Sequence, residues 1–245
     1  MRRIIIGVLV AIIAMVVIGT VGFLAWTSNP YQPMPEAIAA LQSDSIVQIQ
    51  NESWLVFKSR ASEPTTGFIF YPGGLVDDRA YAPMARDIAA RGYMVVIVPM
   101  PFSLAFFDAN RASDVIARYP TIKRWAIGGH SLGGVAAAMF VKSHPVAVHG
   151  LVFWAAYPAD SMRDSQVAVS SIYGTQDGLS TPAKIDASHA LLPATAKFIA
   201  IEGGNHGQFG WYGLQSGDGV ATISREQQQA QIVAATIDLL KQIGN

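Results

Sequence analysis

The sequence GGHSLGG at residues 128–134 joins two segments with opposite local preferences. Residues 125–127, which precede it, are apolar and are typical of a buried strand. Residues 135–141, which follow it, are rich in alanine and contain no proline or glycine, which favours a helix. A strand that turns directly into a helix forces its corner residue into strained backbone geometry. Because Gly129 and Gly133 have no Cβ atom, the strand and the helix can close around that corner.

Ser131 stands at the corner of this predicted turn, two residues after Gly129 and two before Gly133. The pattern Gly-x-Ser-x-Gly between a strand and a helix is typical of a nucleophile elbow. The first N–H groups of the following helix lack partners within it and can stabilise developing negative charge. We therefore predict Ser131 as a nucleophile and the backbone N–H of Leu132 as an oxyanion donor. The alternative is a glycine-serine turn without chemistry.

Strands and helices alternate along most of the chain. The expected strands are residues 45–51, 54–59, 66–71, 93–98, 123–127, 148–154, 167–173 and 196–201. The expected helices are residues 81–91, 108–118, 132–143, 183–191 and 226–243. The first two strands are separated by Glu52 and Ser53 and favour an antiparallel hairpin. This order predicts an α/β fold with a mostly parallel sheet of about eight strands and helices on both faces.

In an open parallel sheet, functional residues gather in loops at the carboxyl ends of the strands. Asp177 and His206 each lie just past a predicted strand, in the chain order Ser131, Asp177, His206. A serine needs a neighbouring imidazole to take its proton, and the imidazole needs a carboxylate to orient it. We predict a catalytic triad of these three residues. Asp160 is the second choice for the acid and Glu202 the third, and each loop residue could instead be an ordinary turn residue.

The loop after the third expected strand has the sequence Pro-Gly-Gly-Leu at residues 72–75, and Gly74 is the predicted second oxyanion donor. His130, next to the nucleophile, is expected to pack at the elbow. Aromatic residues in neighbouring loops are typical of a pocket for an apolar acyl or alkyl group, although core packing or a membrane-facing surface is an equal alternative. The predicted substrate-binding residues are Phe102, Phe106, Tyr157 and Trp211.

Three motifs together resemble the α/β-hydrolase superfamily over roughly residues 45–243: GHSLGG at 129–134, GTQDG at 174–178 and GGNHG at 203–207. FYPGG at 70–74 with VPMP at 98–101 is most similar to the small, lidless branch related to dienelactone hydrolases. That branch typically carries a cysteine nucleophile, so Ser131 favours serine esterase-like activity instead. The chain also has Pro72-Gly73 where His-Gly is usual. Larger relatives insert a cap where this chain has only residues 155–166, which implies an open site.

The N-terminus carries Arg2 and Arg3, followed by residues 4–26 without a charge. This run is long enough to span a bilayer, which takes about 20 residues, and the arginines favour a cytoplasmic N-terminus. We expect a transmembrane anchor at residues 1–26 (or an uncleaved signal), a linker at 27–44 and a catalytic domain without a cap at 45–245. The catalytic domain would then lie outside the cytoplasm, anchored to the membrane. Secretion after signal cleavage is the alternative.

Composition excludes several kinds of chemistry. The chain has no cysteine, which removes disulfides, a thiolate nucleophile and cysteine-based zinc sites. Its formal net charge of zero gives no electrostatic case for binding nucleic acid. We expect no cofactor and no metal, and a small ester or acyl compound as substrate. The predicted function is a membrane-anchored hydrolase of carboxylic esters or thioesters; the alternatives are an acyltransferase on envelope lipid or glycan, a peptidase, or a catalytically silent binding protein.

Overall fold

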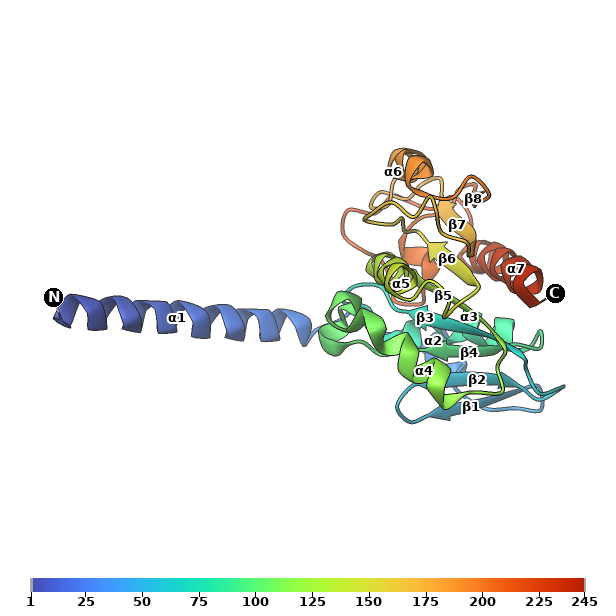
Figure 1. Cartoon of the computed structure of the whole chain (residues 1–245), viewed down its shortest axis with the longest axis horizontal. Coiled ribbons are helices and arrows are strands. Elements are labelled where there is room, and N and C mark those ends of the chain that lie inside the picture. Colours follow the sequence, from blue (N-terminus) through green and yellow to red (C-terminus); the bar gives the residue numbers. More distant parts are fainter. Residues whose placement is uncertain (1, 245) are drawn as a thin grey trace. The chain divides into compact units, whose positions relative to one another are not determined.

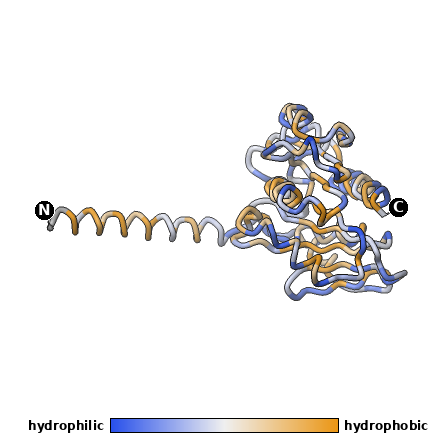
Figure 2. Tube along the Cα trace, in the orientation of Figure 1, coloured by the Kyte–Doolittle hydropathy of each residue, from blue (hydrophilic) through white to orange (hydrophobic). Residues whose placement is uncertain are grey.

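The computed structural model describes residues 2–244. The chain forms two compact units, and the boundary between them in the sequence lies between Pro30 and Tyr31. The first unit consists mainly of helix α1 (Arg2–Thr27). Its segment Ile5–Thr27 has 23 residues and a mean hydropathy of 2.8, and Thr27 is its one buried residue. Figure 2 shows apolar residues along nearly the whole of this helix. The length and composition are those of a membrane-spanning helix, as the sequence predicts.

The second unit is built on a sheet that has eight strands within residues 2–244 (Figure 1). The strands are β1 (Val47–Asn51), β2 (Leu55–Ser59), β3 (Thr66–Tyr71), β4 (Met94–Ile97), β5 (Arg124–His130), β6 (Gly150–Trp154), β7 (Ala168–Gly174) and β8 (Lys197–Ile201). Their spatial order is β1-β2-β4-β3-β5-β6-β7-β8. β2 pairs antiparallel with β1 and β4, and the other pairs are parallel. The predicted mostly parallel sheet with an antiparallel first pair is confirmed.

Helices cover both faces of this sheet. The α-helices of the second unit are α2 (Pro35–Ala39), α3 (Ala82–Ala89), α4 (Ala112–Arg118), α5 (Leu132–Ser143), α6 (Pro182–Ser188) and α7 (Arg225–Gly244). Successive residues of β3 point to opposite faces, as the period of two in a strand requires. Phe68 and Phe70 join the core cluster under α3 and α7, while Ile69 and Tyr71 join the cluster under α4 and α5. The two cores fix the strand ends that carry the candidate site.

Short 3-10 helices occupy several of the connecting loops. They are η1 (Asp78–Tyr81), η2 (Pro101–Ser103), η3 (Ala105–Arg111), η4 (His189–Leu191) and η5 (Gly207–Phe209). The helix expected at 108–118 becomes α-helical only at Ala112, since the residues before it form η3, which is kinked at Asp108 (φ −151°, ψ 56°). The Tyr71 hydroxyl donates to Ala109 O and accepts the Ala112 N–H, both at 2.8 Å, which fixes that junction.

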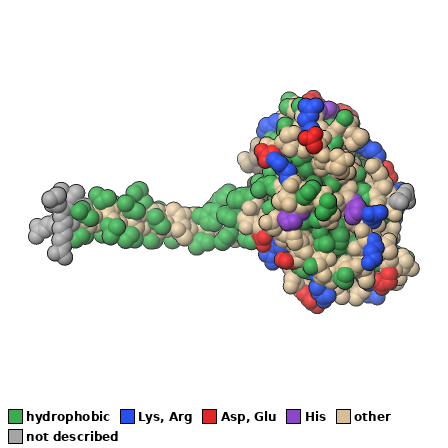
Figure 3. All heavy atoms as spheres, viewed as in Figure 1, with side chains coloured by type: hydrophobic (Ala, Val, Ile, Leu, Met, Phe, Trp, Pro, Cys, Tyr) green, Lys and Arg blue, Asp and Glu red, His purple; other side chains and the backbone are tan. Residues whose placement is uncertain are grey.

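Residues 31–44, expected as a linker, contact the sheet unit directly. The Tyr31 N–H donates to Leu75 O over 2.7 Å, and Asp77 N–H donates to Tyr31 O over 3.0 Å. The Met34 N–H donates to Trp211 O over 2.8 Å. Figure 3 shows Lys, Arg, Asp and Glu scattered with mixed sign over the visible face of the sheet unit. This surface fits the zero net charge of the sequence.

Candidate active site

Ser131 lies directly between β5 and α5, with φ 50° and ψ −119°. A non-glycine residue in such a region costs about 1–3 kcal/mol, and the surrounding structure must hold it there. The Ser131 N–H donates to Trp154 O over 2.9 Å. A Cβ on Gly133 would lie 2.1 Å from Tyr71 O, and one on Gly129 would lie 2.4 Å from the Gly133 carbonyl carbon. Glycine is therefore required at both flanking positions, as the sequence pattern predicts.

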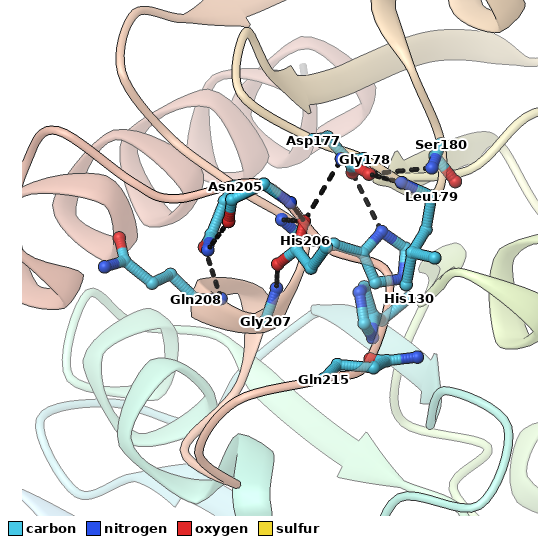
Figure 4. A network of polar contacts seen from close by, with 12 residues as sticks. His130, Asp177, Gly178, Leu179, Ser180, Asn205, His206, Gly207, Gln208 and Gln215 are labelled. Carbon is cyan, nitrogen blue, oxygen red and sulfur yellow. Dashed lines mark hydrogen bonds and ion pairs between the residues drawn. The ribbon is translucent and has the colours of Figure 1, made fainter.

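Asp177 and His206 face each other from the loops after β7 and β8 (Figure 4). Their Oδ2 and Nδ1 atoms are 2.8 Å apart, and both side chains are fully buried. The second carboxylate oxygen of Asp177 accepts the N–H groups of Leu179 and Ser180, at 2.8 and 2.7 Å. An acceptor-only carboxylate beside Nδ1 places the imidazole proton there. The neutral ring therefore has its free lone pair on Nε2, where a general base needs it.

The other two candidates for the acid lie elsewhere. Asp160 pairs with Lys142 at 2.8 Å on the surface. Glu202 is exposed to solvent. The structure thus brings together the first-choice acid and the predicted base.

His206 differs from the expectation of an open site. Its side chain has no exposed area, and within residues 2–244 its Nε2 atom makes no hydrogen bond. The ring of His130 packs against it, with centroids 4.4 Å apart. Ser131 itself stays partly exposed. His130, a residue of the elbow, thus packs against the base, and within residues 2–244 no hydrogen bond joins Ser131 to His206 Nε2. Catalytic hydrogen bonds often tighten only when substrate binds.

The loop after β3 offers one N–H group for an oxyanion. The Gly73 N–H donates to the Tyr81 hydroxyl over 3.0 Å, and the Leu75 N–H donates to a backbone carbonyl over 2.8 Å. The Gly74 N–H between them has no acceptor in the part of the chain that the structure describes. A Cβ on Gly74 would lie 3.1 Å from the Leu132 side chain, so the two predicted donors are neighbours. Since the N–H groups of Gly73 and Leu75 are already bonded, Gly74 is the donor that remains in this loop, and it is also the donor predicted from the sequence.

Tyr81 links this loop to the histidines. Its hydroxyl accepts the Gly73 N–H over 3.0 Å and also forms a hydrogen bond with His130 Nδ1, 2.9 Å away. Burial, and then the repulsion from the neighbouring His206 when that ring is protonated, hold the pKa of His130 well below its usual range. His130 is therefore a neutral ring packed at the elbow, which confirms its predicted place.

The predicted substrate-binding aromatics occupy different surroundings. Phe102 and Phe106 are both 46% exposed and pack around Phe107, with ring centroids 5.4 and 4.5 Å from it. Tyr157 is half-buried in the loop after β6. Trp211 is nearly buried, and its indole N–H donates to Gln229 Oε1. Their role in substrate binding stays a prediction. Within residues 2–244, no group of three or more His, Asp or Glu side chains could hold a metal ion.

A model of the alpha/beta hydrolase family matches residues 67–230, which is more than half of the chain and includes all three predicted triad residues. The chain belongs to this family. A solved structure described as a predicted CIB-like hydrolase from Thermoplasma acidophilum is similar, with 16% identity and a TM-score of 0.57. The match covers 80% of this chain and 99% of that one, and at such identity it shows the fold alone. No curated protein matches the chain.

The sequence did not identify the side chains of α7 that hold the loop around His206 in this hydrolase-family chain. Gln228, fully buried on α7, accepts the Asn205 N–H over 3.0 Å and donates to Asn205 O over 2.8 Å. Arg225 donates to the carbonyls of Gly207 and Gly210. The available signal was a run of glutamines at 227–229 on a helix whose other buried residues are mostly apolar.

Proposed function

We propose that this chain is a membrane-anchored serine hydrolase that cleaves carboxylic esters or thioesters through an acyl-enzyme on Ser131. The observation that carries the proposal is the buried hydrogen bond between Asp177 and His206, whose ring packs against His130, the residue before a serine in strained elbow geometry. Membership of the alpha/beta hydrolase family supports hydrolase chemistry in general. The serine nucleophile and the ester bond are our inference from the site.

Each residue has a defined role in this mechanism. His206 Nε2 takes the proton of Ser131 as its oxygen attacks the carbonyl carbon, and Asp177 stabilises the imidazolium that forms. The backbone N–H groups of Leu132 and Gly74 bind the oxyanion. His206 then gives its proton to the leaving alcohol or thiol. Water repeats the sequence on the acyl-enzyme and releases the acid.

Helix α1 supports the membrane part of the proposal. Its segment Ile5–Thr27 is apolar and, apart from Thr27, not buried, and Arg2 and Arg3 precede this segment. By the positive-inside rule, the N-terminus would stay in the cytoplasm and the catalytic domain would lie outside it. A secreted form after signal cleavage remains the alternative. Fractionation of cells that express the full chain, with alkaline extraction of the membranes, distinguishes the two forms.

The decisive test treats the full chain in detergent with a fluorophosphonate probe and with nitrophenyl esters of graded acyl length. We expect probe labelling of the native chain and none of Ser131→Ala, whose ester turnover should fall at least ~10³-fold. Ser143→Ala is a matched control, because the hydrogen bonds of this exposed serine are all local to the end of α5, with the carbonyls of Met139 and Phe140 and the ring of His144. Labelling that persists in Ser131→Ala would refute the proposal. Acyl transfer to added alcohols in preference to water would identify an acyltransferase.

A further inference from the structure

Asp218 bridges the loops that carry the acid and the base, although it lies in a third segment of the chain. Its Oδ1 atom accepts the N–H groups of Gly178 and His206, both at 3.1 Å. The same atom accepts its neighbour's N–H, from Gly219, at 2.8 Å, and Oδ2 accepts the Gly207 N–H at 2.8 Å. The carboxylate of Asp218 thus binds the backbone of Gly178, which follows Asp177, and the backbone of both His206 and Gly207.

The segment 217–219 fits closely against the acid loop because it is made largely of glycine. Gly217 has φ +84°, a conformation that favours glycine. A Cβ on Gly219 would lie 1.9 Å from Gln176 O, and one on Gly178 would lie 2.5 Å from Gly217 O. The Gly219 carbonyl also accepts a hydrogen bond from the Asn205 side chain over 2.8 Å. Residues 217–219, here called the Asp218 latch, therefore contact both loops at once.

We infer that Asp218 is a positioning residue, which sets the distance between Asp177 and His206 by binding the backbone on both sides of their hydrogen bond. The inference rests on the proposed function, since the pair matters for rate only if His206 is the base. β7 and β8 are adjacent, but their loops leave the sheet separately. Hydrogen bonds donated to an ionised acceptor are about twice as strong as neutral ones, and Asp218 accepts four. Asp218 has no contact with Ser131 among its hydrogen bonds, so it acts through the loops.

Asp218→Asn is the sharpest substitution because it keeps the size of the side chain. If the amide oxygen of Asn takes the place of Oδ1 and keeps its hydrogen bonds, the amide NH₂ takes the place of Oδ2. The NH₂ group then faces the Gly207 N–H, and two donors cannot form a hydrogen bond. We expect kcat for a nitrophenyl ester to fall about 10–100-fold with KM little changed, since misplacement of a catalytic group by about 1 Å costs roughly 10²-fold. We also expect the deshielded ¹H NMR signal of the proton between His206 Nδ1 and Asp177 to weaken or shift. This signal needs no substrate.

Two matched variants separate positioning from general loss of stability. Thr236→Val removes a buried hydrogen bond from the Trp154 indole that involves no residue of either loop, and it should lower the melting temperature while kcat and the NMR signal persist. Val220→Ala changes an 84% exposed residue next to the Asp218 latch and should leave all readouts unchanged. If Asp218→Asn does not fold, Asp218→Glu keeps the charge on a longer stem, and we expect an intermediate loss of kcat and a shifted signal.

The outcomes are distinct. An unchanged NMR signal in a folded Asp218→Asn or Asp218→Glu variant, or a kcat loss no greater than that of Thr236→Val, would overturn the inference. If the native chain neither turns over esters nor reacts with the probe, the proposed function fails. The NMR comparison still decides in that case whether Asp218 positions the Asp177–His206 pair.

Discussion

Tyr81 satisfies two buried groups with one hydroxyl, the Gly73 N–H and His130 Nδ1. Tyr81→Phe leaves both without a partner, and an unsatisfied buried group costs about 1–3 kcal/mol. We expect a loss of unfolding free energy in this range, measured by urea denaturation, and a roughly tenfold lower kcat/KM as the loop that carries Gly74 loosens. Tyr93→Phe is the control, since it removes a partly exposed hydroxyl and should change the free energy by less than about 0.5 kcal/mol. Equal effects of the two variants would contradict the argument.

Asp177→Asn tests the choice of the acid. An amide beside His206 Nδ1 can donate a hydrogen bond and so favour the wrong tautomer, with the proton on Nε2. We expect kcat to fall about 10³–10⁴-fold while the fold persists, as seen by circular dichroism. Asp160→Asn, which breaks the surface ion pair with Lys142, should keep full activity. The reverse ranking of the two variants would move the acid to Asp160.

Helix α5 depends on close contact with the end of β3. A Cβ on Gly133 would lie 2.1 Å from Tyr71 O and 2.4 Å from Pro72 O, so Gly133→Ala must push the helix away from the loop that holds Gly74. We expect a loss of about 1–3 kcal/mol in stability and a fall in probe labelling rate. Met139→Ala on the same helix changes a side chain that is 45% exposed and should affect neither. Labelling by Gly133→Ala at the native rate would show that the spacing of α5 and β3 is not needed.

The boundaries of β3, α5 and β8 could be predicted closely, because turn residues or a change of hydrophobic period mark their ends. β5 was expected to end at Ile127 but continues to His130. Gly128 and Gly129 read as a turn in the sequence, yet they pair with β3 and β6 on both sides. A Cβ on Gly128 would lie 2.4 Å from Val152 O, so its glycine reflects strand packing rather than a turn. The local conformational preference of glycine cannot reveal this requirement, because it comes from packing against a neighbouring strand.

The candidate site shows the same limit. Ser131, Asp177 and His206 could be selected because each follows a strand in a parallel sheet, where topology alone brings loops together. Asp218 could not, since Gly-Asp-Gly at 217–219 is typical of any turn. Three of its four hydrogen bonds come from loops about 10 and 40 residues away in the chain, and the fourth comes from its neighbour Gly219. The burial of His206 Nε2 could not be predicted for a related reason. The short segment at 155–166 indicates that no cap is inserted, but it gives no information on how His130 packs against His206.

Two titratable groups, the half-buried Asp78 and the buried His130, give the domain opposing responses to pH. Burial, and then the adjacent Asp77, raise the pKa of Asp78 from 3.8 to about 6. The folded state thus binds this proton more tightly than the unfolded state, so stability is lost as pH rises from about 4 to 6, by at most about 3 kcal/mol. The lowered pKa of His130 acts in the opposite sense. The unfolded chain binds a proton below about pH 6.5 that the folded chain does not, so stability is lost as pH falls.

These opposing slopes partly cancel between pH 4 and 6, and single substitutions should separate them. Relative to the native chain, Asp78→Asn should gain stability as pH rises from 4 to 6 and keep the gain at pH 7. His130→Asn should lose stability at pH 7, where its bond to Tyr81 is missing, but lose progressively less as pH falls below 6.5. Urea denaturation at half-unit steps of pH measures both, and the slope rather than the absolute stability is the readout. Curves for either variant that run parallel to the native curve would show that the group has the same proton affinity in the folded and unfolded chain, and that its burial does not govern the pH response.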